Sequence, residues 1–177
     1  MSGELFDLVN ERDEVIGVTN KAESHVKALP YRVAAVFVFY GGKLLIQKRT
    51  PEKNGLIDHS VGGHVHQGED YATAAIREMQ EELGLVGPLN FIGKTYEDGH
   101  QFPLRHWLGL FEIEIGEAQY KALKLDLREM EYVKPMTLEE IAHTMHQHPS
   151  VFTGGFRCTL NLYIKHKNLP IAPVPTE

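Results

Sequence analysis

The segment GHVHQGEDYATAAIREMQEELGL, residues 63 to 85, joins a glycine-containing turn to a helix that carries three carboxylates on one side. At about 100° per residue, Glu82 falls about 40° to one side of Glu78 and Glu81 about 60° to the other. Clustered carboxylates repel one another unless a cation lies between them, and hard oxygen ligands select Mg²⁺ or Mn²⁺. The pattern therefore indicates a divalent-metal site on one face of a helix.

The same helix carries an apolar stripe that we expect to pack against the core. The stripe spans about 60° and consists of Ala72, Ile76, Met79 and Leu83. Ala74 and Ala75 lie beside the carboxylates, where their small side chains leave space. The helix is therefore predicted to anchor through one face and to bind metal through another.

Both ends of this helix carry residues that helix ends favour. Glu69 and Asp70 stand at its start, where negative charge complements the helix dipole. Gly84 follows the last apolar residue, where a left-handed residue commonly stops a helix. Arg77 has two candidate partners, Glu81 one turn along the helix and Glu69 across the glycine turn, and the sequence leaves both open.

The spacing of these residues resembles the Nudix box, the signature of a family of hydrolases. The signature is a glycine, five residues, Glu, seven residues, Arg-Glu, an apolar residue, any residue, Glu-Glu, any residue, Gly and an apolar residue. Its positions are filled by Gly63, Glu69, Arg77, Glu78, Met79, Glu81, Glu82, Gly84 and Leu85. A solvated helix with a charged face would explain three glutamates, but it does not explain the bracketing glycines.

The resemblance implies a reaction and a set of residue roles. Nudix enzymes hydrolyse a diphosphate linked to another group, such as a nucleoside diphosphate derivative or a similar small molecule, with Mg²⁺ or Mn²⁺ as cofactor. The implied metal ligands are Gly63, Glu78, Glu81 and Glu82, and the three glutamates are also the implied catalytic residues. Glu69 and Arg77 are implied to support the structure of the box.

An anionic substrate needs local positive charge, because the chain itself is acidic. It has 18 Lys plus Arg against 24 Asp plus Glu, a formal net charge of −6. Besides metal, Arg49 and Lys53 are candidates to bind the substrate phosphates, and His64 is a candidate to touch phosphate or metal. The acidic balance argues against non-specific nucleic-acid binding, so the expected partner is a small phosphorylated molecule.

The composition is that of a folded globular protein. With 177 residues, 24% charged and 42% hydrophobic, the chain is expected to form a single Nudix domain over residues 1–177. Cys158 is the only cysteine, which excludes a disulfide within the chain and fits a reducing compartment. No secretory signal is visible, and the longest apolar stretch, residues 33–40, is too short to span a bilayer. We therefore expect a cytoplasmic protein that does not bind membranes.

The other segments mix strands with helices. Strands are expected at 5–10, 15–19, 31–40, 43–48, 89–96, 105–115 and 129–134, and helices at 21–29, 137–148 and 156–167. The connection 97–103 is expected to overhang the site, and the tail from Pro170 to be extended or loose. Together with the Nudix resemblance, this order predicts an α/β/α sandwich with a mixed β-sheet. The N-terminal strands, within about residues 5–30, are also a possible homodimer contact, and the C-terminal helices are expected within about residues 137–168.

The flanks of the box resemble one branch of the family, which includes type 1 isopentenyl diphosphate isomerases and related hydrolases. The resemblance is carried by LFDLVNERDEVIGVTNKAESH (5–25), KLLIQKRT (43–50) and HSVGGHV (59–65). In the isomerases a catalytic cysteine lies just before the glycine–histidine pair, where this chain has Ser60, Val61 and Gly62. Because the sequence offers no cysteine–glutamate pair for proton transfer at carbon, we expect a hydrolase, with the isomerase as the alternative.

Two further questions stay open at the level of sequence. A module that binds a nucleotide without cleaving it is a third possibility, which a damaged box would favour. Nudix enzymes often use an acid outside the box, and no spacing selects one here. The candidates are Glu97, Asp98, Glu112, Glu114, Glu129 and Glu131, with His106 as a residue that could face the pocket in place of an acid. Cys158 is expected to be a small buried apolar residue in the last helix.

Overall fold

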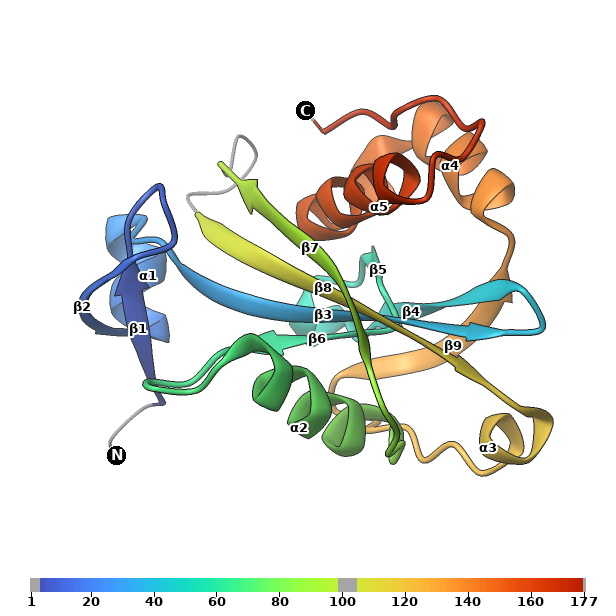
Figure 1. Ribbon diagram of the computed structural model, residues 1–177, viewed down its shortest axis with the longest axis horizontal. Helices are drawn as coiled ribbons and strands as arrows, with labels where there is room; N and C mark the ends of the chain where they lie inside the picture. Colours follow the sequence, from blue (N-terminus) through green and yellow to red (C-terminus); the bar gives the residue numbers. More distant parts are fainter. Residues whose placement is uncertain (1–3, 99–104, 177) are drawn as a thin grey trace.

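The computed structural model describes residues 4–98 and 105–176, in which strands and helices are mixed along the chain (Figure 1). The strands are β1 (Leu5–Val9), β2 (Val15–Asn20), β3 (Tyr31–Tyr40), β4 (Lys43–Arg49), β5 (Ile57–Asp58), β6 (Val61–His64), β7 (Asn90–Glu97), β8 (His106–Ile115) and β9 (Met130–Met136). The helices are α1 (Lys21–Lys27), α2 (Tyr71–Leu83), α3 (Glu117–Lys121), α4 (Leu138–Gln147) and α5 (Gly154–His166). Every expected element is present, and β5, β6 and α3 are additional.

Seven strands form one mixed sheet, as predicted. Its order is β5-β4-β3-β8-β7, with β6 paired to β3 and β9 paired to β4. β3 and β8 run parallel, from Tyr31 opposite His106 to Tyr40 opposite Ile115, and the other pairs are antiparallel. β3 lies inside the sheet because its valine and phenylalanine side chains favour a strand that is buried on both faces.

Helices cover both faces of this sheet, with α2 on one face and α4 and α5 on the other (Figure 1). The even-numbered side chains of β3 from Ala34 to Val38 belong to the core under α2. The odd-numbered side chains from Ala35 to Phe39 belong to the core under α4 and α5. Because side chains alternate along a strand, β3 supplies both cores, and the predicted α/β/α sandwich is confirmed.

β3 and β4 separate soon after the hairpin that joins them, and Ser60 fills the split. Its hydroxyl accepts a hydrogen bond from the N–H of Val38 at 2.9 Å and donates one to the carbonyl of Leu45 at 2.5 Å. β6 follows directly and takes the place of β4 beside β3. Ser60 therefore sets the position from which Gly62 and Gly63 enter the sheet.

Helix α2 begins and ends where the sequence predicts, but it packs through a different face. Its buried residues are Ala74, Ala75, Met79, Glu82 and Leu83. Ala72 is exposed and Ile76 is 43% exposed, so half of the predicted stripe is wrong. The small alanines and the glycines of β6 let the helix approach the sheet on its acidic side, which rotates the packed face toward the carboxylates and buries Glu82.

The first and the last described segments are both held against the body of the protein. β1 and β2 form a separate two-stranded sheet, anchored by the buried side chains of Phe6 and Val9. The C-terminal segment is extended but not loose, because Val174 is buried and Asn161 binds both its carbonyl (2.9 Å) and its N–H (2.7 Å). Residues 99–103 of the predicted overhanging connection lie outside the described residues. Among the described residues, no helix has the length and hydropathy needed to cross a membrane.

Candidate active site

The glycine that opens the box is in direct contact with its second glutamate. A Cβ placed on Gly63 would lie 1.9 Å from Cδ of Glu78, so only glycine leaves room for that carboxylate beside β6. Gly63 is opposite Ala34, on the α2 side of the sheet. Gly62 faces the other way, and a Cβ there would lie 2.3 Å from Cε1 of His59. The glycine pair thus holds one polar side chain against each face of the strand.

Arg77 ties the glycine turn to α2. Its Nε and Nη2 donate to the two oxygens of Glu69 at 3.0 and 2.9 Å, and Nη2 also donates to the carbonyl of His64 at 2.9 Å. Its Nη1 donates to Glu78 at 2.6 Å and lies 3.6 Å from Glu81. Of the two partners that the sequence left open, Glu69 is the close, bidentate one. Burial alone would raise the pKa of Glu69, but the hydrogen bonds from Arg77 and from the backbone hold it below its ordinary value.

The fold crowds two of the box carboxylates together. Glu82 is 5% exposed, and the amide of Gln47 lies 3.4 Å from its Oε2. Burial, reinforced by the charges of Glu78 and Asp58, raises the pKa of Glu82 well above its ordinary value. Burial also raises the pKa of Glu78, in spite of its hydrogen bond from Arg77. A cation between these carboxylates would offset the cost of ionising both.

The donor set fits a hard divalent cation chemically. Carboxylate oxygens and a backbone carbonyl are the ligands that Mg²⁺ and Mn²⁺ favour, and buried like charges attract such an ion. Glu81 lies at the solvent-exposed edge of this group of carboxylates, with a side chain that is 59% exposed, and it is accessible to a metal ion. Within residues 4–98 and 105–176, no three His, Cys, Asp or Glu side chains already converge on one point. In this arrangement Glu78 is instead engaged by Arg77.

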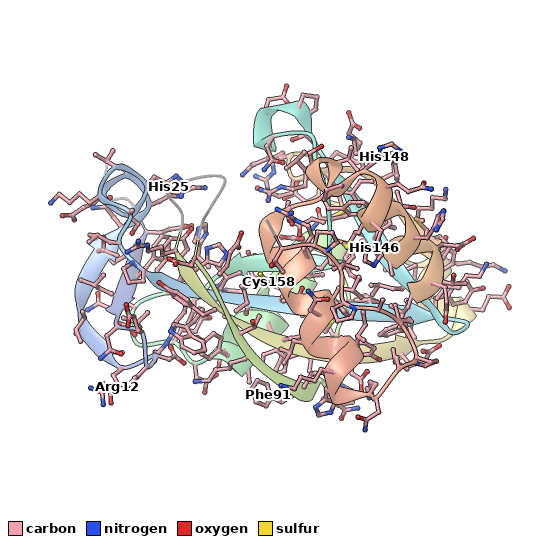
Figure 2. The ribbon with its side chains drawn as sticks, turned by 90° about the horizontal axis from the view of Figure 1, so that it is seen from above. Arg12, His25, Phe91, His146, His148 and Cys158 are labelled. Carbon is pink, nitrogen blue, oxygen red and sulfur yellow. The ribbon has the colours of Figure 1, made fainter. Side chains whose placement is uncertain are left out.

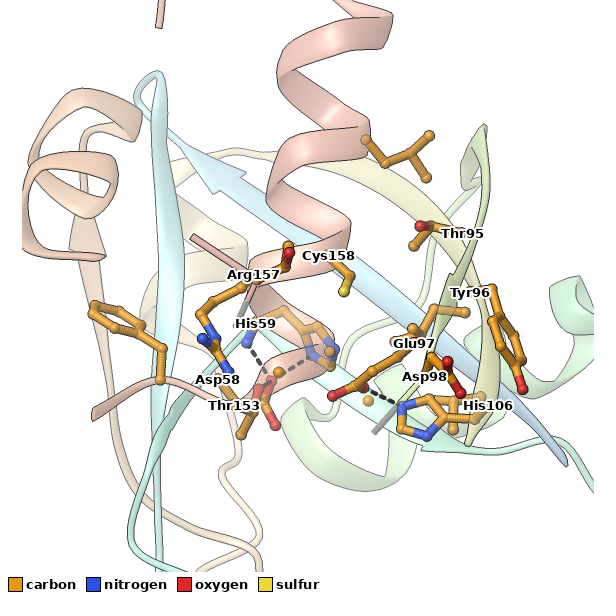
Figure 3. A pocket seen from close by; sticks show the side chains of 18 of the residues that line it. Asp58, His59, Thr95, Tyr96, Glu97, Asp98, His106, Thr153, Arg157 and Cys158 are labelled. Atoms are coloured by element: carbon orange, nitrogen blue, oxygen red, sulfur yellow. Dashed lines mark hydrogen bonds and ion pairs between the residues drawn. The ribbon is translucent and has the colours of Figure 1, made fainter. Parts of the chain in front are cut away.

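A cavity of 720 Å³ runs along α5, on the side of the sheet that Gly62 faces (Figure 3). Gly62, Gly63 and His64 line it, whereas the box glutamates are not among its described lining residues. Its charged lining residues are Lys21, Arg49, Lys94, Arg157 and Lys165 against Asp58, Glu97 and Asp98. The cavity wall therefore carries more positive than negative charge in a protein whose net charge is negative.

Asp58 is the centre of a polar network on this wall (Figure 3). Its Oδ2 accepts a hydrogen bond from Nη1 of Arg49 at 3.1 Å. Its Oδ1 accepts from the hydroxyl of Thr153 at 2.6 Å and from the N–H of His59 at 2.9 Å, with Nδ1 of His59 at 3.3 Å. These partners outweigh the burial that would raise the pKa of Asp58 and hold it below its ordinary value. Because Thr153 is also the N-cap of α5, the network joins β4, β5 and α5.

Glu97 and His106 form a second pair, at the ends of β7 and β8. Nε2 of His106 lies 2.7 Å from Oε2 of Glu97. A Cβ on Gly154 would lie 1.9 Å from Oε1 of Glu97, so the first turn of α5 leaves room for this carboxylate. Of the residues considered outside the box, Glu97, Asp98 and His106 line the cavity.

The three predicted substrate-binding residues occupy different places. Arg49 lines the cavity beside Asp58. His64 also lines it, with its ring stacked on Phe6 at a centroid distance of 4.6 Å, and burial lowers its pKa to about 3. Lys53 pairs with Glu129 at 2.7 Å and is not among the described residues of the cavity wall.

Comparison with known families adds an independent line of evidence. The family model described as NUDIX domain matches residues 30–153. The chain belongs to the Nudix family. The matched stretch contains the complete Nudix box, and Nudix hydrolases are among the relatives and the structural neighbours, so the protein is a Nudix-type hydrolase.

The Nudix relatives differ in how much of each chain they share. An uncharacterized Nudix hydrolase of Yersinia pestis is 31% identical over 170 residues, which cover 93% of this chain and 88% of that protein. The Nudix hydrolase YfcD of Salmonella typhi is 38% identical over 116 residues, 62% of this chain and 61% of that protein. The crystal structure of DR0079 from Deinococcus radiodurans aligns with a TM-score of 0.66 at 27% identity, over 80% of this chain and 88% of that one.

An isomerase is similar to this Nudix chain as well. The isopentenyl-diphosphate Delta-isomerase of Pectobacterium atrosepticum is 31% identical over 161 residues, 86% of this chain and 87% of that protein. Ser60, which precedes the glycine pair, is fully buried and bonded to two strands. The only cysteine of the chain, Cys158, is therefore not at the position of the isomerase cysteine. It lies on α5, near the centre of the view in Figure 2, whereas Arg12 lies at the edge of the molecule.

The position of Cys158 corrects one expectation. Cys158 and Glu97 line the same cavity, although the sequence showed no cysteine–glutamate pair. Burial, followed by the charge of Glu97, raises the pKa of the Cys158 thiol to about 12. Nor is Cys158 simply a buried apolar residue, because it is partly exposed at the cavity wall.

Sequence reasoning missed Asp58, His59 and Thr153 as residues of this Nudix site. Asp58 and Thr153 are far apart in the chain, so no local spacing relates them. The available signal was the pair Gly154-Gly155 after a threonine, which suits a capped helix start that another group approaches closely. Gly62 was a similar signal, because a glycine in a strand can mark a place that another group, here the ring of His59, approaches closely.

Proposed function

We propose that this Nudix protein is a Mg²⁺- or Mn²⁺-dependent pyrophosphohydrolase that cleaves a diphosphate linkage in a nucleoside diphosphate derivative or a similar small molecule. The observation that carries the proposal is the complete box, in which Glu78 packs against Gly63 and Glu82 is buried beside it. Burying Glu82 beside Glu78 serves no purpose in the core, because burying like charges is unfavourable without a cation.

In this proposal the metal is held by the carbonyl of Gly63 and by Glu78, Glu81 and Glu82. When bound, the ion supplies positive charge that neutralises the phosphates and lowers the pKa of water. A carboxylate of the box is the candidate to accept the proton of the attacking water. Arg77 would orient Glu78 through their 2.6 Å contact.

The substrate phosphates would be bound by the residues that precede the box glutamates. Arg49 offers a guanidinium, which binds phosphate oxygens through several N–H groups. His64, neutral at physiological pH because burial lowers its pKa, would form a hydrogen bond rather than an ion pair. Lys53 would contribute on leaving its partner Glu129.

The test is hydrolysis by the purified protein, measured as release of phosphate or pyrophosphate with Mg²⁺ and with Mn²⁺. The panel contains nucleotides, nucleotide sugars, dinucleoside polyphosphates and prenyl diphosphates. Glu78→Gln, Glu81→Gln and Glu82→Gln should each lower turnover at least roughly tenfold, the scale of general-base and metal effects. If none of the three does so, the proposed function is wrong.

A second candidate function is isomerisation of a prenyl diphosphate. It is favoured by the 31% identical isomerase and by the cavity that Cys158 and Glu97 share. Against it, no cysteine stands just before the glycine pair. Ser60, which stands there, hydrogen-bonds to Val38 of β3 and to Leu45 of β4. Deuterium exchange into isopentenyl diphosphate that Cys158→Ser abolishes would establish this function. Ligand binding by calorimetry without any turnover would instead indicate a nucleotide-binding module.

A further inference from the structure

We propose that Asp58 is a positioning residue that holds the guanidinium of Arg49 at the cavity wall, where Arg49 binds a phosphate group of the substrate. The inference rests on the pyrophosphohydrolase function proposed above, because it concerns the same site. It adds a residue outside the box and assigns the cavity to an anionic part of the substrate.

The two oxygens of Asp58 have separate partners. Oδ1 accepts from the hydroxyl of Thr153 and from the N–H of His59, so it is fixed by the cap of α5 and by the backbone. Oδ2 accepts from Nη1 of Arg49 at 3.1 Å. The carboxylate therefore has partners that hold it independently of Arg49, so it can restrict the arginine side chain.

Arg49 keeps donors available for a ligand. A guanidinium has five N–H donors, and Asp58 takes one of them through Nη1. In the part of the chain that the structure describes, no other side-chain hydrogen bond of Arg49 is present. The Arg49 side chain is 30% exposed, whereas that of Asp58 is 8% exposed. Both residues line the cavity, and the guanidinium is the more accessible of the two to a ligand there.

The register of the sheet places this pair near the box carboxylates. Asp58 on β5 is opposite Gln47 on β4, and Arg49 lies two residues further along β4. The amide of Gln47 lies 3.4 Å from Glu82. One diphosphate could therefore be bound at one end by the box and at the other by Arg49.

The charge of the cavity agrees with an anionic ligand. Five Lys and Arg side chains line it against three Asp and Glu side chains, counting the described lining residues. Lys21 and Lys165 are exposed. A phosphate would accept hydrogen bonds from Lys21 and Lys165, whereas a hydrocarbon chain offers them no acceptor.

A purely structural role for Asp58 is the competing explanation, since it also binds the cap of α5. Thr153→Ser keeps the hydroxyl, and Thr153→Ala removes the contact with Asp58 while leaving Arg49 and Asp58 in place. If Asp58 acts only through α5, Thr153→Ala and Asp58→Asn should weaken ligand binding equally. If Asp58 positions Arg49, Thr153→Ala should lower the melting temperature with a smaller effect on binding.

The experiment is calorimetric titration of inorganic pyrophosphate with Mg²⁺ into the wild type, Asp58→Asn, Arg49→Gln and the double variant. Each single variant should weaken binding roughly tenfold, the scale of one charge-assisted hydrogen bond. The double variant should be no weaker than Arg49→Gln, because Asp58 acts through Arg49. Arg128→Gln, which removes an exposed cation paired with Asp126 outside the cavity, is the matched control and should bind as the wild type does.

Additive losses in the double variant, or unchanged binding by Asp58→Asn, would overturn the proposal, as would a wild type that does not bind pyrophosphate. If Asp58→Asn does not fold, the variant Arg49→Lys takes its place in the experiment. A lysine lacks the planar guanidinium that can donate to Asp58 and to a phosphate at the same time. Wild-type affinity in Arg49→Lys would equally overturn the proposal. Turnover separates the two proposals. If the protein hydrolyses a substrate but Asp58→Asn and Arg49→Gln weaken binding additively, only the positioning role of Asp58 is wrong. If the two substitutions are non-additive but no substrate is hydrolysed, only the proposed function is wrong.

Discussion

Glu78 and Gly63 are packed so closely that the Cβ of any other residue at position 63 would fall 1.9 Å from the carboxyl carbon of Glu78. A contact of that length cannot exist, so a side chain at position 63 must displace the glutamate. The glycine is thus required by tertiary packing, in addition to any role of its carbonyl.

Gly63→Ala should therefore lower hydrolysis at least roughly tenfold, because small displacements of catalytic groups have effects of this size. The measurement is turnover on the best substrate of the panel, with circular dichroism to verify folding. Gly116→Ala is the matched control, since its Cβ would lie 3.9 Å from the nearest atom, Oε1 of Gln119. Full activity in Gly63→Ala would contradict the contact.

Divalent metal should stabilise the folded protein through Glu78 and Glu82. With Mg²⁺ or Mn²⁺ at about a hundredfold excess over Kd, we expect the melting temperature to rise by roughly 5 °C or more, and EDTA to reverse the rise. Glu82→Gln should show a much smaller rise, whereas Glu139→Gln, an exposed acid on α4, should behave like the wild type. An equal rise in all three proteins would mean that the metal acts elsewhere.

The ion pair of Glu69 with Arg77 predicts a pH-dependent stability. The pKa of Glu69 in the folded protein lies below the ordinary value of 4.5, so its contribution is present above that pH and is lost as the pH falls through the folded pKa. Glu69→Gln should melt several degrees below the wild type at pH 7, and the difference should be smaller at a pH well below 4.5. Thermal melts at both pH values of this variant and of Glu11→Gln, an exposed loop acid, make the test. A difference that does not change with pH would exclude the ionised pair as its cause.

Ser60 should contribute to stability rather than to chemistry. Ser60→Ala leaves the N–H of Val38 and the carbonyl of Leu45 without their partner. This should lower the free energy of unfolding by about 1–3 kcal/mol. Each kcal/mol corresponds to about 2–4 °C in melting temperature for a domain of this size. The exposed Ser150→Ala is the control and should melt as the wild type does. A catalytic role would be indicated by lost turnover at an unchanged melting temperature.

Local patterns predicted most of the secondary structure, because capping, hydrophobic alternation and glycine placement act between residues close in the chain. Asp70 caps α2 by accepting from the N–H of Thr73 at 2.7 Å, and Gly84 ends the helix with a φ of 65°. The rotation of α2 was not predictable in this way. A helical wheel ranks faces by hydrophobicity, and it does not include the glycine strand that lets Ala74 and Ala75 approach the sheet.

The sequence by itself determined the Nudix box and the mixed α/β order of elements, and it predicted a divalent metal as the chemically suitable ion, since each depends on residue type and on spacing along one segment. Only the tertiary structure decided that Arg77 pairs with Glu69, that Glu82 is buried, and that Asp58, Arg49 and Thr153 meet on one wall. These contacts join residues from different strands and helices. Their distances depend on how the sheet splits and how α5 packs, and no periodicity within a single segment records that information.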